Sequence, residues 1–137
     1  MESTILLEVC RRVRSRIHAI AVAFAVVENS KTCFLTSDGS RMELAIVDRA
    51  IRAGTTIGPH RHEDRIEAAA PIRYGGTILG ALIARWTVGT AHDLSRVGPM
   101  LGAVAAATAP VLWAADRAAP TGLGDNAERA AGDRAAR

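Results

Sequence analysis

The sequence predicts an α+β domain in which an antiparallel β-sheet carries helices on both faces. Two apolar runs on either side of Gly75-Gly76 indicate a β-hairpin, because a two-residue turn needs positive φ angles that glycine adopts without strain. Segments of helical periodicity stand near both ends of the chain and once between the strand-like segments. We therefore expect the two terminal helices on one face of the sheet, and a short helix and a loop on the other.

The first element is a helix over residues 4–17. Its apolar residues recur at helical spacing, and Glu8 is placed to pair with Arg11 or Arg12 on the outer side. Residues 18–28 then alternate small and large side chains, which is typical of a strand whose two faces meet different neighbours.

Residues 32–37 predict the second strand of this first hairpin. A second helix begins at Ser40, which forms a capping box with Glu43, and ends at Gly54. Residues 55–65 show no clear periodicity, so they predict a loop or a short strand, where binding residues concentrate.

The central hairpin fills residues 66–86. If its register follows directly from the Gly75-Gly76 turn, residues 77–85 are apolar on both sides and belong in the middle of the sheet. Pro71 lacks a backbone donor, so its other neighbour must be a bulge or a sheet edge. This register places the following residues on one core face: Ala68, Ala70, Ile72, Leu79, Ala81 and Ile83.

The last helix covers residues 97–115, which contain no charged residue. This length meets the threshold for a membrane span, but the alanines and prolines make the segment only weakly hydrophobic. Pro110 should kink it. Its larger apolar residues form one stripe, with Ala109 off it, which favours a soluble helix that packs on the sheet or on a partner helix.

Composition indicates one domain over residues 1–118, since 137 residues with 49% hydrophobic content suit a single core. Residues 119–137 lack apolar periodicity and predict a disordered tail or a truncated linker. The net charge of +3 comes from arginines mixed with carboxylates, so we expect no direct nucleic-acid contact. No signal-peptide pattern stands at the start, and Cys10 and Cys33 suit reduced thiols, so a cytoplasmic protein is expected.

Residues 62–115 resemble the second half of a GAF domain. The resemblance rests on Ala-Pro-Ile, Gly-Gly and Ile-Leu-Gly between residues 70 and 80, followed by a loop with Asp93 and an alanine-rich helix. The first half matches only in its order of elements. In detail, Pro-Ile-Arg-Tyr-Gly-Gly with Leu-Ile-Ala-Arg-Trp is similar to the amino-terminal sensor of bacterial enhancer-binding transcription regulators. The resemblance implies signal transduction through a small-molecule effector. We expect no cofactor.

Two features of the sequence suggest functions other than sensing, namely a metal site and a thiol enzyme. The spacing Gly54-x5-His60-x-His62-x4-Glu67 matches the first half of the cupin metal motif, but the second half is absent. Some GAF domains reduce free methionine sulfoxide with cysteine thiols, whereas Cys33 stands alone here and Cys10 lies on a packing helix. We therefore expect no catalytic residues and no bound metal.

We expect a ligand pocket between the sheet and residues 42–62. A fold that has lost its pocket and acts only in structural or protein interactions is the alternative. The expected ligand contacts come from the second strand, the short helix, the irregular segment and the central hairpin: Phe34, Ile46, Ile57, His60, His62 and Arg73.

We also expect a homodimer through the first and last helices. One sheet face can cover only part of both apolar stripes, and the remainder would form an exposed apolar patch. GAF-like sensors typically pair through these helices, so the resemblance also implies a homodimer. Because the last helix is amphipathic, we expect no membrane contact. The expected interface residues are Leu6, Val9, Val13, Leu101, Val104 and Leu112, with small residues at 102, 105 and 109.

Overall fold

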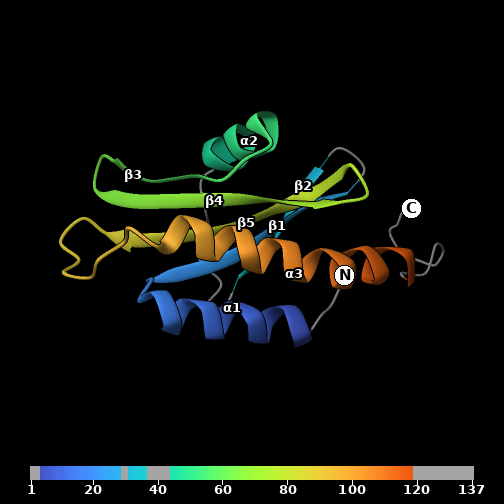
Figure 1. Cartoon of the computed structure of the whole chain (residues 1–137), viewed down its shortest axis with the longest axis horizontal. Helices are drawn as coiled ribbons and strands as arrows, with labels where there is room; N and C mark the ends of the chain where they lie inside the picture. Colours follow the sequence, from blue (N-terminus) through green and yellow to red (C-terminus); the bar gives the residue numbers. More distant parts are fainter. Residues whose placement is uncertain (1–3, 29–30, 37–43, 119–137) are drawn as a thin grey trace.

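The computed structural model describes residues 4–28, 31–36 and 44–118, and Figure 1 shows their arrangement. The predicted capping box at Ser40 and Glu43 and the predicted tail at 119–137 lie outside the described residues. In chain order the elements are α1 (Thr4–Ile17), β1 (Ala21–Glu28), β2 (Lys31–Thr36), α2 (Leu44–Ala53), β3 (Ile57–His62), β4 (Arg65–Tyr74), β5 (Thr77–Thr87) and α3 (Val97–Ala118). This order confirms the predicted succession of helices and hairpins.

The described strands form one antiparallel sheet in the order β2-β1-β5-β4-β3. Helices α1 and α3 pack on one face, and α2 packs on the other (Figure 1). The predicted fold class is therefore confirmed. Strand β5 lies in the middle of the sheet, as its apolar character on both sides predicts.

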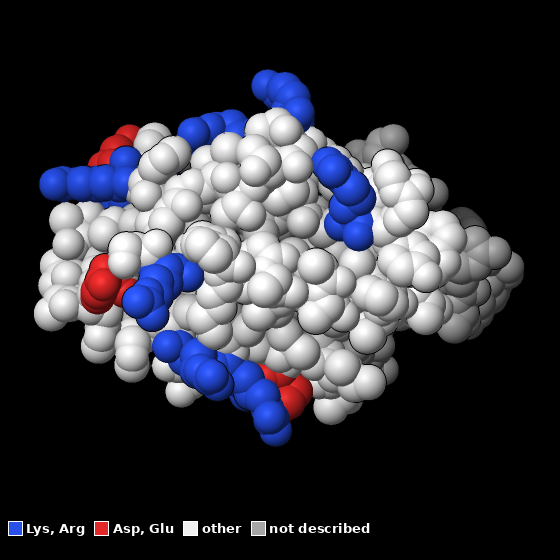
Figure 2. Space-filling model, viewed as in Figure 1, with Lys and Arg blue, Asp and Glu red and all other residues white. Residues whose placement is uncertain are grey.

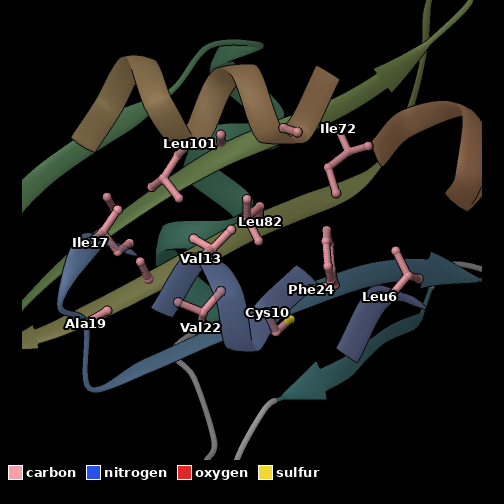
Figure 3. Packing of buried hydrophobic residues seen from close by; sticks show 14 of the residues in the cluster. Leu6, Cys10, Val13, Ile17, Ala19, Val22, Phe24, Ile72, Leu82 and Leu101 are labelled. Atoms are coloured by element: carbon pink, nitrogen blue, oxygen red, sulfur yellow. The ribbon is translucent and has the colours of Figure 1, made fainter. Parts of the chain in front are cut away.

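The larger core lies between the sheet and the two terminal helices (Figure 3). Leu6, Cys10, Val13 and Ile17 face it because they recur every three or four residues along α1. The indole Nε1 of Trp86 donates a hydrogen bond of 2.9 Å to the Ile17 carbonyl oxygen, so the buried ring joins the end of α1 to β5.

The outer side of α1 carries the predicted ion pairs. Glu8 accepts hydrogen bonds from Arg11 at 2.8 Å and from Arg12 at 3.0 Å. The Arg12 and Arg11 guanidinium groups lower the pKa of this exposed carboxyl. Solvent screens such pairs, so they favour the helix only slightly.

The central hairpin has the predicted turn but a different register. Gly75 and Gly76 adopt φ angles of 58° and 85°, and Tyr74 pairs with Thr77 as expected. The pairing then shifts by one residue between Ile72 and Arg73, which leaves Leu79 as the extra residue of a β-bulge in β5.

The bulge exchanges the faces of the following residues. Ala68, Ala70 and Ile72 share the α1 and α3 face with Leu82, Ala84 and Trp86. Ala81 and Ile83 instead lie on the α2 face, so the predicted grouping of these two residues with Ile72 is wrong. A turn fixes only the first pairs of a hairpin, and one bulged residue inverts every side chain beyond it.

Gly80 lies where β5 comes closest to β1. A Cβ atom at this position would overlap the Ala25 carbonyl oxygen, so only glycine fits here. Pro71 pairs with Ala81 of β5 and lies beyond Ala69, the last β4 residue paired with β3. Its missing donor therefore falls at an edge, as expected.

Helix α3 packs on β4 and β5 through a stripe of small and large apolar residues. By length and composition, Val97–Ala114 could cross a membrane, with a mean hydropathy of 1.5, and 33% of it is buried within the domain. The expectation that Ala109 lies off the packed stripe is wrong, because small side chains allow the closest approach to the sheet. The buried stripe is Val97, Leu101, Ala105, Thr108, Ala109 and Leu112.

The Gly80 contact predicts a strong response to substitution. Replacing Gly80 by alanine should lower the free energy of unfolding by about 1–3 kcal/mol, because the added methyl group must displace the β1 main chain. Urea denaturation of wild type and variant measures this difference. Gly89→Ala is the matched control, since nothing lies within 4 Å of its added Cβ atom. Equal stabilities of the two variants would contradict this packing.

Candidate functional site

A small pocket opens on the α2 face, between the amino-terminal half of α2 and the end of the sheet formed by β3 and β4. Its volume is about 90 Å³. This is about three times the volume that one molecule occupies in liquid water, so the pocket suits a ligand of a few non-hydrogen atoms. The lining residues are Ala45, Ile46, Arg49, His60, Arg61, His62 and Glu67.

Glu67 is the buried charged residue of this site. It stands on β4 directly opposite Arg85 of β5, and it is 3% exposed. Its Oε2 atom accepts hydrogen bonds from Arg85 Nη2 at 2.9 Å and Nε at 3.1 Å, and from Arg65 Nε at 3.2 Å. A buried carboxylate needs such partners, because desolvation strongly disfavours an unpaired charge.

The second carboxylate oxygen of Glu67 is different. All three hydrogen bonds reach Oε2, and among the described residues none donates to Oε1. A carboxylate oxygen has two lone pairs, and buried acceptors are nearly always satisfied. Glu67 is one of the residues that line the pocket.

The two histidines of β3 belong to the same face of the sheet as Glu67. His60 pairs with Glu67 and His62 pairs with Arg65, and residues directly opposite each other share a face. Both imidazoles are exposed, and His62 Nε2 lies 3.9 Å from Glu63 Oε2. Alternation along the strand therefore presents two imidazoles beside one buried carboxylate.

Helix α2 covers the pocket from above. Ile46 is buried against the sheet and supplies an apolar wall, while Arg49, one turn further on, is exposed at the rim. Residues three apart lie on neighbouring positions of a helix face, which explains why both reach the same pocket. The helix ends where Gly54 adopts a φ angle of 70°, as its predicted termination requires.

The predicted ligand contacts divide into three groups. Ile46, His60 and His62 line the pocket. Ile57 packs against the apolar cluster beneath α2. Arg73 lies at the opposite end of α2, where its Nη2 donates a hydrogen bond of 3.2 Å to the Gly54 carbonyl oxygen, and the side chain of Phe34 lies outside the described residues.

Arg49 and Glu67 line the pocket but were not among the predicted contacts. The sequence carries a signal for Glu67, because it is the one charged residue in the otherwise apolar run 66–72. An isolated charge within a buried strand requires a partner or a function. No comparable signal marks Arg49, which resembles Arg52, the other exposed arginine of its helix.

The expected dimer surface requires correction. Leu6, Val13, Leu101 and Leu112 are at most 5% exposed within the single chain, so they contact its own sheet and are closed to a partner. Val9 and Val104 are half-buried at the margin of the core. Periodicity shows that a helix has an apolar face, but it does not show which part of that face the chain covers by itself.

The described residues offer neither an activated thiol nor a metal cluster. Burial raises the pKa of the Cys10 thiol to about 12, so this thiol is protonated near neutral pH and is a poor nucleophile. Among the residues described, no group of three His, Cys, Asp or Glu side chains is placed to hold a metal ion. The side chain of Cys33 lies outside the described residues.

Comparison with known proteins gives a likeness of fold. No known family model matches the sequence, and no curated protein matches it. Among solved structures, the GAF domain of an Acinetobacter phosphoenolpyruvate-protein phosphotransferase has a TM-score of 0.68 at 11% identity, over 88% of this chain and 89% of that one. A type II free methionine-R-sulfoxide reductase from Thermoplasma acidophilum has a TM-score of 0.60 at 17% identity, over 77% of this chain and 88% of that one. The chain therefore has a GAF-like fold.

Proposed function

We propose that this protein is a non-catalytic, cytoplasmic module that binds a small molecule and serves a regulatory or signalling system. The observation that carries this proposal is the pocket between α2 and the β3–β4 hairpin, where a buried carboxylate meets basic side chains. Pockets with a few converging polar groups and an apolar wall are the usual form of a small-molecule site.

The chemistry of the lining residues favours binding over catalysis. The described lining contains no serine, threonine, cysteine or lysine, so it offers no hydroxyl, thiol or amine nucleophile. Glu67 is held by two arginines that neutralise its charge, which suits a fixed recognition group better than a group that exchanges protons. A thiol-dependent enzyme is a competing function, suggested by the fold of the Thermoplasma reductase, and loss of activity on replacing Cys33 would be its signature.

The regulatory part of the proposal draws on the resemblance to sensors of bacterial transcription regulators. A ligand in this pocket would contact both α2 and the sheet, and it would therefore favour one position of α2 over others. An interaction module without a ligand is the alternative. The sensor and the interaction module differ in one measurable property, which is whether any small molecule stabilises the folded protein.

A ligand that occupies the pocket should raise the melting temperature. At a ligand concentration 100-fold above its Kd, binding to the native state adds about 2.7 kcal/mol. A thermal-shift screen of metabolites and nucleotides measures this effect, and Arg49→Ala should weaken the response because its guanidinium lies at the pocket rim.

Arg52→Ala is the matched control, since Arg52 is also exposed on α2 but does not line the pocket. It should respond as wild type does. A screen in which no compound stabilises the protein would favour the interaction module and would reject the sensor.

The outer face of α3 favours a homodimer. Val97–Ala114 contains no charged residue, and its exposed positions are Pro99, Ala103, Ala106, Ala107, Pro110 and Ala114. Figure 2 shows an uncharged surface across the middle of the molecule, where α3 lies in Figure 1, with basic side chains around it. Ile5 of α1, which packs on the same sheet face, is 63% exposed. We propose that a second copy of the chain covers this surface, because two-fold pairing closes such a face on itself.

If a second copy covers this surface, a charge introduced there by substitution should separate the subunits. Ile5→Asp and Ala106→Glu should each weaken association by about tenfold or more, since burying an unpaired charge costs more than 1.4 kcal/mol. Sedimentation velocity measures the change, and circular dichroism checks that the fold persists. Ile20→Asp is the control, because Ile20 is 47% exposed at the start of β1. Wild-type protein that sediments as a monomer at high micromolar concentration would exclude the dimer.

A further inference from the structure

The pocket between α2 and the β3–β4 hairpin is asymmetric in charge. Two arginines, Arg49 and Arg61, line it with one carboxylate, Glu67, which Arg85 and Arg65 already hold from outside the pocket, so basic groups outnumber acidic ones in the lining even when both histidines are neutral. A positive, partly enclosed site attracts a small anion. Arg49 at the rim presents a planar fork of donors that matches a carboxylate.

A simple anion nevertheless fits this site poorly. Glu67 lines the pocket with a buried carboxylate whose Oε1 atom accepts no hydrogen bond from the described residues. An anionic oxygen placed against Oε1 would be repelled, and an apolar group would leave this buried acceptor without a hydrogen bond. Only a ligand group with an O–H or N–H donor both avoids this repulsion and gives Oε1 a hydrogen bond.

We propose that the ligand is a small molecule with an anionic carboxylate and a hydrogen-bond donor, which is either a hydroxyl or an ammonium group. This inference rests on the proposed ligand-binding function. The anionic group faces Arg49 and the histidines, and the donor faces Glu67 Oε1. The pocket volume of about 90 Å³ suits a two- or three-carbon hydroxy acid or amino acid.

Glu67 is then the residue that determines specificity, and Arg49 supplies affinity for any anion. A site that is built to hold a donor rejects the analogue without it, because its buried acceptor is then left unpaired. Arg65 and Arg85 act through Glu67, since they fix its Oε2 atom and thereby direct Oε1 to the ligand.

The test compares matched small carboxylates, with inorganic phosphate beside them, on the full chain by NMR titration. Glycolate and glycine supply the donor, acetate and propionate lack it, and inorganic phosphate tests an anion without carbon. Glycolate or glycine should bind at least about tenfold more tightly than acetate, which corresponds to about 1.4 kcal/mol. Equal affinities of acetate and its donor-bearing analogue, or tighter binding of phosphate, would overturn the proposal.

Two variants separate the roles of the two residues. Glu67→Gln should abolish the preference for the donor-bearing anion, whereas Arg49→Ala should weaken all carboxylates alike and keep the preference. Arg52→Ala should bind as wild type does. If Glu67→Gln fails to fold, the wild-type series still decides.

The outcomes also separate this inference from the function on which it rests. If none of these anions binds while another class of compound stabilises the protein, the ligand class is wrong and the sensor proposal stands. If no compound of any class stabilises the protein, the sensor proposal itself is rejected, and this inference with it.

Discussion

Strand β5 must be buried on both faces at once, and the rest of the structure follows from this constraint. Ala81, Leu82, Ile83 and Ala84 are all 0% exposed, so successive side chains point into two separate cores. A strand of this kind requires neighbours on both edges and helices on both faces. The terminal helices and α2 supply the cover, while β1 and β4 supply the hydrogen bonds. Small residues along β4 and α3 allow these layers to approach closely.

The bulge at Leu79 connects this core to the candidate site. With the uninterrupted register that the turn alone suggests, Glu67 would lie opposite Ala84 and its carboxylate would have no partner on β5. The extra residue shifts the pairing by one and brings Arg85 opposite Glu67. One irregularity beside the turn therefore sets the charge pair at the other end of the hairpin. Gly80 follows the bulged residue directly. Its lack of a side chain allows β5 to approach the β1 main chain at this point.

Local signals in the sequence were enough to predict the order of elements, the Gly75-Gly76 turn and the two-sided burial of β5. The register beyond Ile72 was not predictable, because no local signal in the sequence marks the bulge at Leu79. His60, His62 and Ile46 were predictable as pocket residues, since a polar segment follows a helix there. The role of Glu67 as a recognition group was not predictable, because its environment depends on Arg85. Periodicity identified the apolar faces of α1 and α3 but could not assign Leu101 and Leu112 to the chain's own core.

The β4–β5 register places a carboxylate on the α2 face, and we propose that a bound molecule lies against it. A crystal structure of the protein with the first small molecule found to stabilise it would show this position. We expect the ligand between α2 and the β3–β4 hairpin, in contact with Ile46 and His60 and with a donor within hydrogen-bonding distance of Glu67 Oε1. A ligand that lies instead against α1 and α3 would contradict it.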